Sequence, residues 1–423
     1  MPIRHVAAVV VGNALEFYDF LTYSYFAVYI GKVFFPSKDP TSSLLLSLAT
    51  FGVGFLTRPV GAIVIGAMGD RIGRKPAMVF SFSLMGVAIV GLALTPSYAA
   101  IGAAAPALVI LFRLLQGFAL GGEVGPTTAY MIEAAPPSRR GFYASMQYTS
   151  QDFAAMMAGL AGALLASRLS DQQLQDWGWR AAMLLGACIV PFGLMLRKSL
   201  PETLHAAEDA VLAPDTGDGV SVPRVKLKPY TKLILLGLIM LASGTIASYV
   251  LSYMTTYALA TLKMTATVAF GATIVNGLFA VVFEPVSGWL SDKFGRKPIM
   301  VIPGIILAAS ILPSFWVIAH FREAMMFYAA VAWLSIVTAI AQTPVIVTLT
   351  ESLPKNIRSG AVATVYAFAI SIFGGSTQFT VAKLIAVTNN ALAPAFYWTV
   401  AAVLGVIAMM LVTESAPVKM GRK

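Results

Sequence analysis

The chain contains one cysteine, Cys188, and three histidines among its 423 residues. One cysteine cannot pair within the chain, so a disulfide framework is excluded. So few cysteine and histidine ligands also argue against a structural zinc site. No P-loop, GxSxG or HExxH motif occurs, and no soluble segment is long enough to form a catalytic domain. We therefore expect no enzymatic activity, no cofactor and no bound metal.

Charged residues are also scarce. They make up 11% of the chain, whereas a globular protein has about 25%. Hydrophobic residues reach 58% and the mean hydropathy is +0.79. A membrane-spanning helix needs about 20 apolar residues. The apolar runs predict an all-α membrane protein with twelve transmembrane helices, at residues 6–35, 42–68, 77–95, 104–132, 141–168, 178–197, 232–260, 266–290, 298–317, 323–350, 360–386 and 392–412.

The stretch 198–231 separates these spans into two sets of six. It is polar, rich in proline, glycine and aspartate, and has no helical period, which is typical of a flexible linker. We therefore expect two six-helix bundles, at residues 1–197 and 232–423. The first apolar run holds Glu16 and Asp19 and has no small-residue cleavage site, so it does not resemble a removable signal peptide.

The basic residues predict the orientation in the membrane. Twenty of the 29 lysines and arginines fall at the same end of the predicted spans. Because loops rich in Lys and Arg stay in the cytoplasm, both termini and the linker are expected there. The net charge of +10 is then a signal of topology, and the expected partner is a lipid bilayer, not a nucleic acid.

A repeat relates the two halves of the sequence. GAMGDRIGRKP at 66–76 recurs as GWLSDKFGRKP at 288–298, an offset of 222 residues. A second pair, which contains Glu133 with Arg140 and Glu351 with Arg358, keeps nearly the same offset. Two halves of equal topology imply a pseudo-two-fold axis along the membrane normal, an arrangement suited to rocking about a central site.

The doubled G-x-x-x-D-R/K-x-G-R-K loop resembles the signature of the major facilitator superfamily. Further stretches resemble its metabolite:H⁺ symporter branch, namely GNALEFYDF (12–20), TRPVGAIVIGAMGDRIGRK (57–75), RLLQGFALGGEVG (113–125), WGWR (177–180) and RKSLPET (197–203). SMQYTSQDFA (145–154) and FGGST (373–377) look most like the citrate and tricarballylate transporters, although Gln378 stands where those relatives tend to have proline. The branch takes up citrate, tricarballylate, 2-oxoglutarate, shikimate, or proline and betaine together with protons.

Ionisable residues inside the predicted spans need a partner or a function, since each costs at least about 2.5–3.5 kcal/mol to insert. Arg113 and Asp19 fall at similar depth in spans that line the central cavity of this superfamily. A guanidinium can hold a carboxylate substrate by two parallel hydrogen bonds; alternatively, Arg113 only neutralises Asp19 or Glu16. Glu16 and Asp19 share one helix face, so mutual repulsion makes either of them a candidate proton carrier.

Other polar residues extend this predicted site. Glu123 is a weaker candidate for proton coupling and is more simply explained by a fixed hydrogen bond or a pair with Arg58. Asp152 and Glu284 are further candidates for coupling. The expected substrate contacts besides Arg113 are Asn13, Tyr18, Gln116, Gln147, Gln151, Tyr249, Tyr253, Gln342, Ser376 and Thr377, for any of which interhelical bonding or packing is the alternative.

The repeated loops predict a cytoplasmic gate. Charge pairs there would hold the halves together on the inside, and partly solvated pairs are weak enough to open reversibly. The alternative is that these charges only fix the topology. The predicted gate residues are Asp70, Arg74, Glu133, Arg140, Asp292, Arg296, Glu351 and Arg358.

These expectations combine into one hypothesis about function. The sequence predicts proton-coupled uptake of a di- or tricarboxylate, such as citrate or tricarballylate, across the inner (plasma) membrane by alternating access, with the protein working as a monomer. Symport of another small metabolite (2-oxoglutarate, shikimate, proline or betaine) and proton-driven export remain alternatives.

Overall fold

The computed structural model describes residues 13–14, 17–72, 74–121, 135–198, 230–353, 362 and 364–419. Within these ranges the chain is almost entirely helical, in agreement with the all-α prediction. Eight of the helices are long and apolar enough to cross a membrane, and Val79–Leu94 is a shorter apolar helix.

The first half of the chain begins with helical residues 17–25. The next helices are α2 (Ala27–Phe34), α3 (Pro40–Val53), α4 (Arg58–Ile72), α5 (Arg74–Leu94), α6 (Tyr98–Ile101), α7 (Ala104–Gly121), α9 (Arg140–Arg168), α10 (Asp171–Gln173) and α11 (Trp179–Lys198). The second half contains α13 (Thr231–Ala260), α14 (Ala266–Phe294), α15 (Arg296–Phe321), α16 (Ala324–Ser352), helical residues 364–369 followed by α18 (Gly375–Thr388), and α19 (Ala393–Leu411).

Local sequence explains several helix ends. Asp39 precedes α3 and accepts hydrogen bonds from the backbone N–H groups of Thr41 and Ser42, both at 3.0 Å, while Pro40 occupies the first helical position. Between α14 and α15 the connection is Gly295 alone, with φ of +107°. Only glycine adopts this conformation without strain, which explains the glycine in this copy of the repeated motif.

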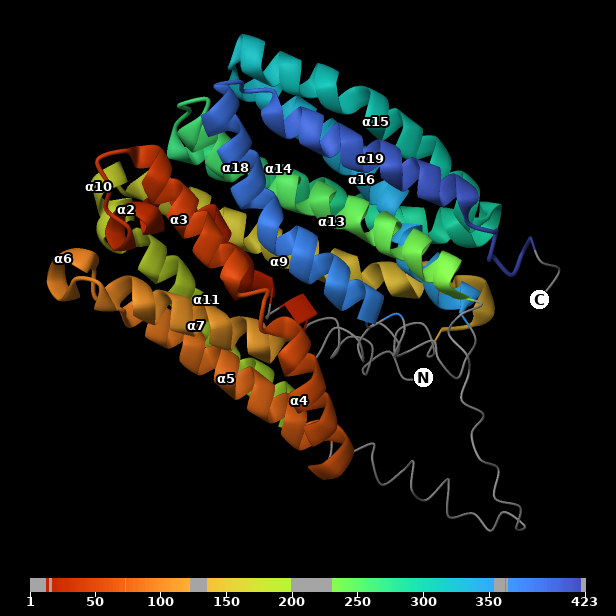
Figure 1. Cartoon of the computed structure of the whole chain (residues 1–423), viewed down its shortest axis with the longest axis horizontal. Coiled ribbons are helices and arrows are strands. Elements are labelled where there is room, and N and C mark those ends of the chain that lie inside the picture. Colours follow the sequence, from red (N-terminus) through yellow and green to blue (C-terminus); the bar gives the residue numbers. More distant parts are fainter. Residues whose placement is uncertain are drawn as a thin grey trace.

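Helices α13 to α19 gather on one side of the molecule, and α4, α5, α7 and α11 gather on the other (Figure 1). Helix α9 lies along the boundary and packs against α14 over its length. Glycines permit this close approach: an added Cβ at Gly288 would lie 2.5 Å from Gly141 O, and one at Gly277 would lie 2.8 Å from Asp152 O. Helices α9 and α14, which correspond to the fifth and eighth predicted spans and come from different halves of the chain, are therefore in direct backbone contact.

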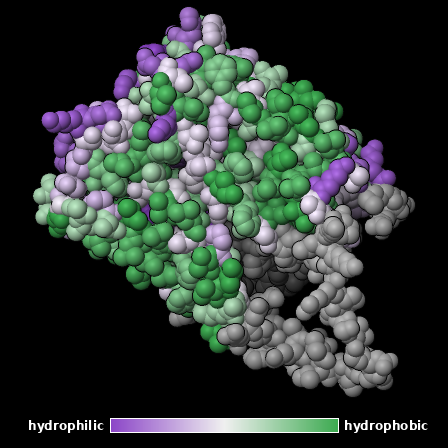
Figure 2. Space-filling view, in the orientation of Figure 1, coloured by the Kyte–Doolittle hydropathy of each residue, from purple (hydrophilic) through white to green (hydrophobic). Residues whose placement is uncertain are grey.

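The outer surface is strongly apolar. Large side chains such as Ile63, Met325 and Val387 are more than 70% exposed, and hydrophobic residues cover much of the visible face, with hydrophilic ones concentrated toward its extremities (Figure 2). A soluble protein rarely exposes so large an apolar area. This surface is explained by contact with lipid tails.

We call the end of the bundle that carries Asp70 and Asp292 the motif end, and the end that carries Phe26 and Phe270 the far end.

Candidate functional site

A cavity of about 110 Å³ lies between helices of the two halves. Its walls come from the first helical segment and α9, and from α13, α14, α16 and residues 366–370. Three of the predicted substrate contacts line it, namely Gln151, Tyr249 and Gln342. This is the position in which alternating access requires a binding site.

Two carboxyl groups face this cavity, Asp152 from α9 and Glu284 from α14. The helices that carry them touch, since a Cβ added to Gly277 of α14 would lie 2.8 Å from Asp152 O. Glu284 is 5% exposed. None of the described residues that line the cavity is lysine, arginine or histidine. The pair was only a secondary candidate for coupling in the sequence, yet these are the acids that the structure brings together.

Neutral polar groups complete the wall. Ser335 donates a hydrogen bond to Asn276 Oδ1 at 2.6 Å, linking α16 to α14. Gln342 packs against Gly244 of α13, where an added Cβ would lie 2.9 Å from its Oε1. Ser335 and Tyr366 also line the cavity. The sequence does not single them out, because hydroxyl and phenol side chains are frequent in ordinary helix packing.

Arg113 is fully buried on α7 but does not line the cavity. Its Nη1 donates to Gln116 Oε1 at 2.7 Å and its Nη2 to Phe51 O at 3.3 Å. The guanidinium carbon lies 4.2 Å from the ring centre of Phe20 and 4.7 Å from that of Tyr23. Stacking of this kind stabilises a cation where water is absent.

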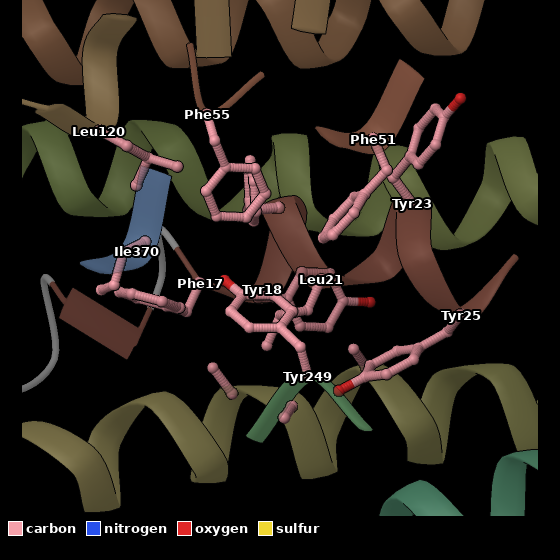
Figure 3. Close-up of a cluster of buried hydrophobic side chains, with 14 of the residues drawn as sticks. Phe17, Tyr18, Leu21, Tyr23, Tyr25, Phe51, Phe55, Leu120, Tyr249 and Ile370 are labelled. Atoms are coloured by element: carbon pink, nitrogen blue, oxygen red, sulfur yellow. The ribbon is translucent and has the colours of Figure 1, made fainter. Parts of the chain in front are cut away.

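Phe20 stands between two arginines. The guanidinium carbon of Arg58 lies 4.6 Å from the Phe20 ring centre and 4.4 Å from that of Phe55. Phe51 and Phe55 in turn contact Tyr249, at centroid separations of 6.1 and 5.5 Å. Figure 3 shows this aromatic cluster between the helices. Tyr249 also lines the cavity, so one layer of aromatic rings separates both arginines from it. We name Phe51, Phe55 and Tyr249 the aromatic layer.

Asp19 lies elsewhere. Its side chain is buried and faces α11, where a Cβ added to Gly186 would overlap its Oδ1. No hydrogen bond reaches that oxygen from the described residues. The structure therefore does not show the alternative pairing of Asp19 with Arg113. Glu16 and Glu123, the other predicted coupling acids, lie outside the described residues.

The remaining predicted substrate contacts take part in packing. Asn13 bonds to Gln147 O at 3.2 Å and to Ser150 Oγ at 2.8 Å, and so joins the first span to α9. Tyr18 donates to Ala182 O at 3.2 Å. Buried Tyr253 packs on Tyr257. Two further predicted contacts lie on α18, the exposed Ser376 and the buried Thr377. They donate to backbone carbonyls of the preceding π-helical turn (Ile370–Gly374), at Ile372 and Phe373 respectively.

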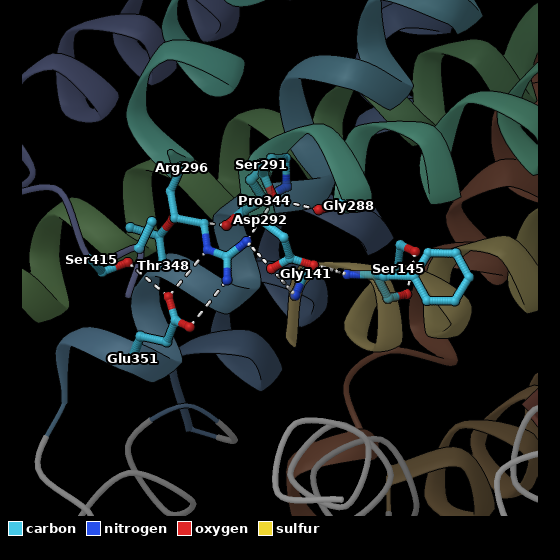
Figure 4. A network of polar contacts seen from close by, with 12 residues as sticks. Gly141, Ser145, Gly288, Ser291, Asp292, Arg296, Pro344, Thr348, Glu351 and Ser415 are labelled. Carbon is cyan, nitrogen blue, oxygen red and sulfur yellow. Dashed lines mark hydrogen bonds and ion pairs between the residues drawn. The ribbon is translucent and has the colours of Figure 1, made fainter. Parts of the chain in front are cut away.

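An ionic network lies at the motif end (Figure 4). Arg296 Nη1 lies 2.6 Å from Asp292 Oδ1, and the same guanidinium makes two bonds to Glu351, of 3.1 and 3.2 Å. Asp292 also accepts from the backbone N–H groups of Gly141 and Phe142, at 2.8 and 2.9 Å. Since these belong to the first turn of α9, the carboxylate caps a helix from the other half of the chain. We name this group the Asp292 clamp.

The other predicted gate residues are less fully defined. The backbones of Asp70 and Arg74 lie at the adjoining ends of α4 and α5, and Arg140 begins α9. Glu133 and Arg358 lie outside the described residues. Among the gate residues that the structure describes, Glu351 pairs with Arg296.

Glu414, which the sequence did not single out, completes the network from beyond α19. It accepts from the backbone N–H groups of Arg296 and Lys297, at 2.9 and 3.0 Å, and so caps α15. Burial raises the pKa of this carboxyl, but the bonds from these amides and from those of Ser415 and Ala416 outweigh it and hold the pKa below its usual value. Ser415 Oγ also donates to Glu351 at 3.0 Å.

At the far end the two halves are joined by packing. Phe26 contacts Phe270 of α14 at a centroid separation of 4.7 Å. Ser24 donates to Gln378 Oε1 at 2.7 Å, and both side chains are buried. Gln378, the residue that departs from the citrate-type pattern, thus links α18 to the first span.

Comparisons with known proteins agree with this architecture. The model of the Major Facilitator Superfamily matches residues 10–377. The "Citrate-proton symporter" of Klebsiella pneumoniae is 34% identical over 405 residues, which cover 94% of this chain and 88% of the relative. The "Alpha-ketoglutarate permease" of Escherichia coli (strain K12) is 32% identical, with 92% and 88% covered. The "Proline/betaine transporter" of Salmonella typhimurium is 30% identical, with 98% and 84% covered.

A solved structure supports the fold. The "Partially occluded inward open conformation of the xylose transporter XylE from E. coli" superimposes with a TM-score of 0.76 at 18% identity, covering 98% of each chain. At this identity the likeness concerns the fold alone. Together with the family match and the relatives, it identifies the chain as a multi-pass membrane transporter and not an enzyme. The chain belongs to the Major Facilitator Superfamily.

Proposed function

We propose that this transporter is a proton symporter that takes up a di- or tricarboxylate, such as citrate or tricarballylate, by alternating access. The observation that carries the proposal is the 34% identity, over 94% of the chain, to a protein described as a citrate-proton symporter. The proposed location is the inner (plasma) membrane, with the motif end and both termini in the cytoplasm, and the proposed working unit is a monomer.

The buried arginines support an anionic substrate. A guanidinium keeps its charge and can donate two parallel bonds to a carboxylate. Arg113 and Arg58 both lie directly behind the aromatic layer. Rotation of Phe51 and Tyr249 away from Arg113 would bring its guanidinium into contact with the cavity.

Residues 1–197 and 232–423 form the two proposed moving units, joined by the linker at 198–231. In this proposal the Asp292 clamp is part of the cytoplasmic gate, together with Asp70, Arg74 and the loops that contain Glu133 and Arg358. The gate is proposed to open when the substrate leaves toward the cytoplasm.

A symporter of another small metabolite is the second candidate. The relatives described as transporters of alpha-ketoglutarate and of proline and betaine favour it, and shikimate belongs to the same group of substrates. Proton-driven export is a weaker alternative, since the relatives include a protein described as a citrate-proton symporter and one described as an alpha-ketoglutarate permease.

Transport in proteoliposomes tests the proposal. An inward proton gradient should drive accumulation of radiolabelled citrate or tricarballylate, and a protonophore should abolish it. The same vesicles are tested with 2-oxoglutarate, shikimate, proline and betaine. Accumulation of a zwitterion but of no organic acid would select the second candidate, and uptake that ignores the proton gradient would refute symport.

Substitution of Arg113 by lysine tests the substrate class. Lysine keeps the charge but loses the bidentate geometry, so we expect affinity for citrate to fall about 10- to 100-fold, with proline, if it binds, affected less than about 3-fold. Arg168→Lys, at the exposed end of α9, is the matched control. Equal losses for both solutes would assign Arg113 to packing.

A further inference from the structure

The contact between α9 and α14 is fixed on both sides of Glu284. On one side, a Cβ added to Gly288 would lie 2.5 Å from Gly141 O; on the other, one added to Gly277 would lie 2.8 Å from Asp152 O. Because the two backbones touch at both points, the closed seam holds Asp152 and Glu284 on neighbouring helices that line the same cavity.

No described lysine, arginine or histidine lines the cavity that holds the pair, and Arg58 and Arg113 lie behind the aromatic layer. The groups that face the pair from its own and neighbouring helices are Tyr25 of the first span, Tyr148 and Thr149 of α9, and Tyr366. From α13 and α16 the lining residues are neutral, including Tyr249, Ser335 and Gln342. Glu284 Oε2 is buried and receives no hydrogen bond from the described donors.

Two carboxyl groups that line one cavity can share a proton. A protonated carboxyl can donate a hydrogen bond to the other group, whereas two carboxylates are only acceptors. Two adjacent negative charges in a cavity without a cation would repel strongly. A proton on one of the two groups removes this repulsion.

We propose that Asp152 and Glu284, which lie where the two halves of the chain meet, together form the proton-binding site of this transporter and carry the proton. This inference rests on the proposed symport. It differs from the sequence-based assignment of the proton to Asp19 or Glu16, because Asp19 faces α11 and does not line the cavity.

The location of the pair explains how a proton and an anion travel together. An ionised pair repels a carboxylate substrate from the cavity that it lines, so the proton binds first. When the substrate has left toward the cytoplasm, the pair releases its proton on that side, and the empty carrier returns with the pair ionised. Substrate binding thus depends on the protonation of residues that lie where the two halves meet.

Asp152→Asn and Glu284→Gln, each a neutral mimic of a protonated carboxyl, test the inference. Wild type and variants are reconstituted, and two activities are measured with radiolabelled citrate: accumulation driven by an inward proton gradient, and exchange against internal citrate without a gradient. We expect accumulation to fall about 10-fold or more while exchange stays within about 3-fold of wild type, since a fixed neutral pair permits binding without proton release. If wild type instead accumulates 2-oxoglutarate or proline, that solute becomes the probe.

Two controls accompany these variants. Asp176→Asn makes the same chemical change on an exposed side chain of the far end, and it should leave both activities unchanged. Asp19→Asn tests the competing assignment. A coupling defect confined to Asp19→Asn, with normal accumulation in Asp152→Asn and Glu284→Gln, would overturn the inference.

The outcomes separate this inference from the proposed function. No gradient-driven accumulation of any tested solute by wild type refutes the symport itself. Accumulation by wild type together with full accumulation by both neutral variants refutes only the carboxyl pair. Loss of accumulation and exchange together in both variants also counts against it, because neutral mimics should preserve exchange. Stimulation of wild-type uptake by a sodium gradient in place of the proton gradient would reassign the pair to a metal cation.

Discussion

Replacing Asp292 by asparagine should release α9 from α14 at the motif end. The carboxylate accepts two backbone N–H groups of α9 and pairs with Arg296 at 2.6 Å. Its side chain is only 6% exposed, so water screens these interactions little. Asparagine offers one acceptor oxygen where aspartate offers two, and it carries no charge.

The magnitude follows from these contacts. A hydrogen bond to a charged group contributes about 1.5–3 kcal/mol. Asparagine keeps one amide bond in neutral form, and Arg296 keeps both bonds to Glu351. The net loss is therefore about 2–3 kcal/mol, which lowers the ratio of closed to open clamp about 30- to 150-fold at 1.4 kcal/mol per factor of ten.

Spin-label distance measurements can report this ratio. Ser138 and Lys293 are exposed beside the clamp on its two sides, and cysteines introduced there, with Cys188 replaced by serine, accept the labels. We expect the short-distance population of the parent protein to give way to longer distances in Asp292→Asn. Asp176→Asn should leave the distribution unchanged. An unchanged distribution in Asp292→Asn would refute the idea that this carboxylate holds the two helices together.

Two further predictions concern the same end of the molecule. Gly141→Ala should open the clamp as well, because the added Cβ would lie 2.5 Å from Gly288 O. Gly66→Ala is the control and should leave the clamp closed, since the Cβ added there meets nothing within 4 Å. Equal spin-label distances in the two variants would contradict the packing argument. Glu414→Gln should lower stability at neutral pH by about 0.5–2 kcal/mol, since it weakens the cap of α15, and a thermal-unfolding series checks this. The pKa of Glu414 lies below its usual 4.5, so its contribution to stability is present above pH 4.5 and is lost as the pH falls through the lowered pKa. The unfolding temperatures of wild type and variant should therefore converge in acid. A difference that stays constant with pH would contradict this reasoning.

Helix positions could be predicted well from the sequence, because the length of an apolar run is set by membrane thickness. The predicted span 141–168 corresponds to Arg140–Arg168, and 266–290 to Ala266–Phe294. The predicted span 42–68 is interrupted by a turn at residues 54–57. That break accompanies a tertiary contact: an added Cβ at Gly117 would overlap Gly54 O, and hydropathy carries no information about such an approach.

The site could be predicted only in part. Residue counting gives depth along a helix, so it predicts Arg113 and Asp19 at one level. It does not give the direction in which a side chain faces, and Asp19 points toward Gly186 of α11. The contact of Asp152 with Glu284 joins residues more than 130 positions apart on helices from different halves. No periodicity within either helix specifies that pairing.

The arrangement of charges around the aromatic layer suggests how it takes part in coupling. Arg58 and Arg113 stack on Phe55 and Phe51 on one side of the layer, and the carboxyl pair faces the cavity that Tyr249 lines on the other. In the proposed mechanism, a substrate anion that displaces the layer meets the guanidinium of Arg113, and protonation of the carboxyl pair removes its repulsion of that anion. Tyr249→Ala removes the ring on the cavity side and should let citrate reach the arginines without this rearrangement. We expect it to bind citrate more tightly, because no ring has to move first, while proton-driven accumulation becomes slower. Weaker binding of citrate by Tyr249→Ala would show instead that the ring is itself a substrate contact.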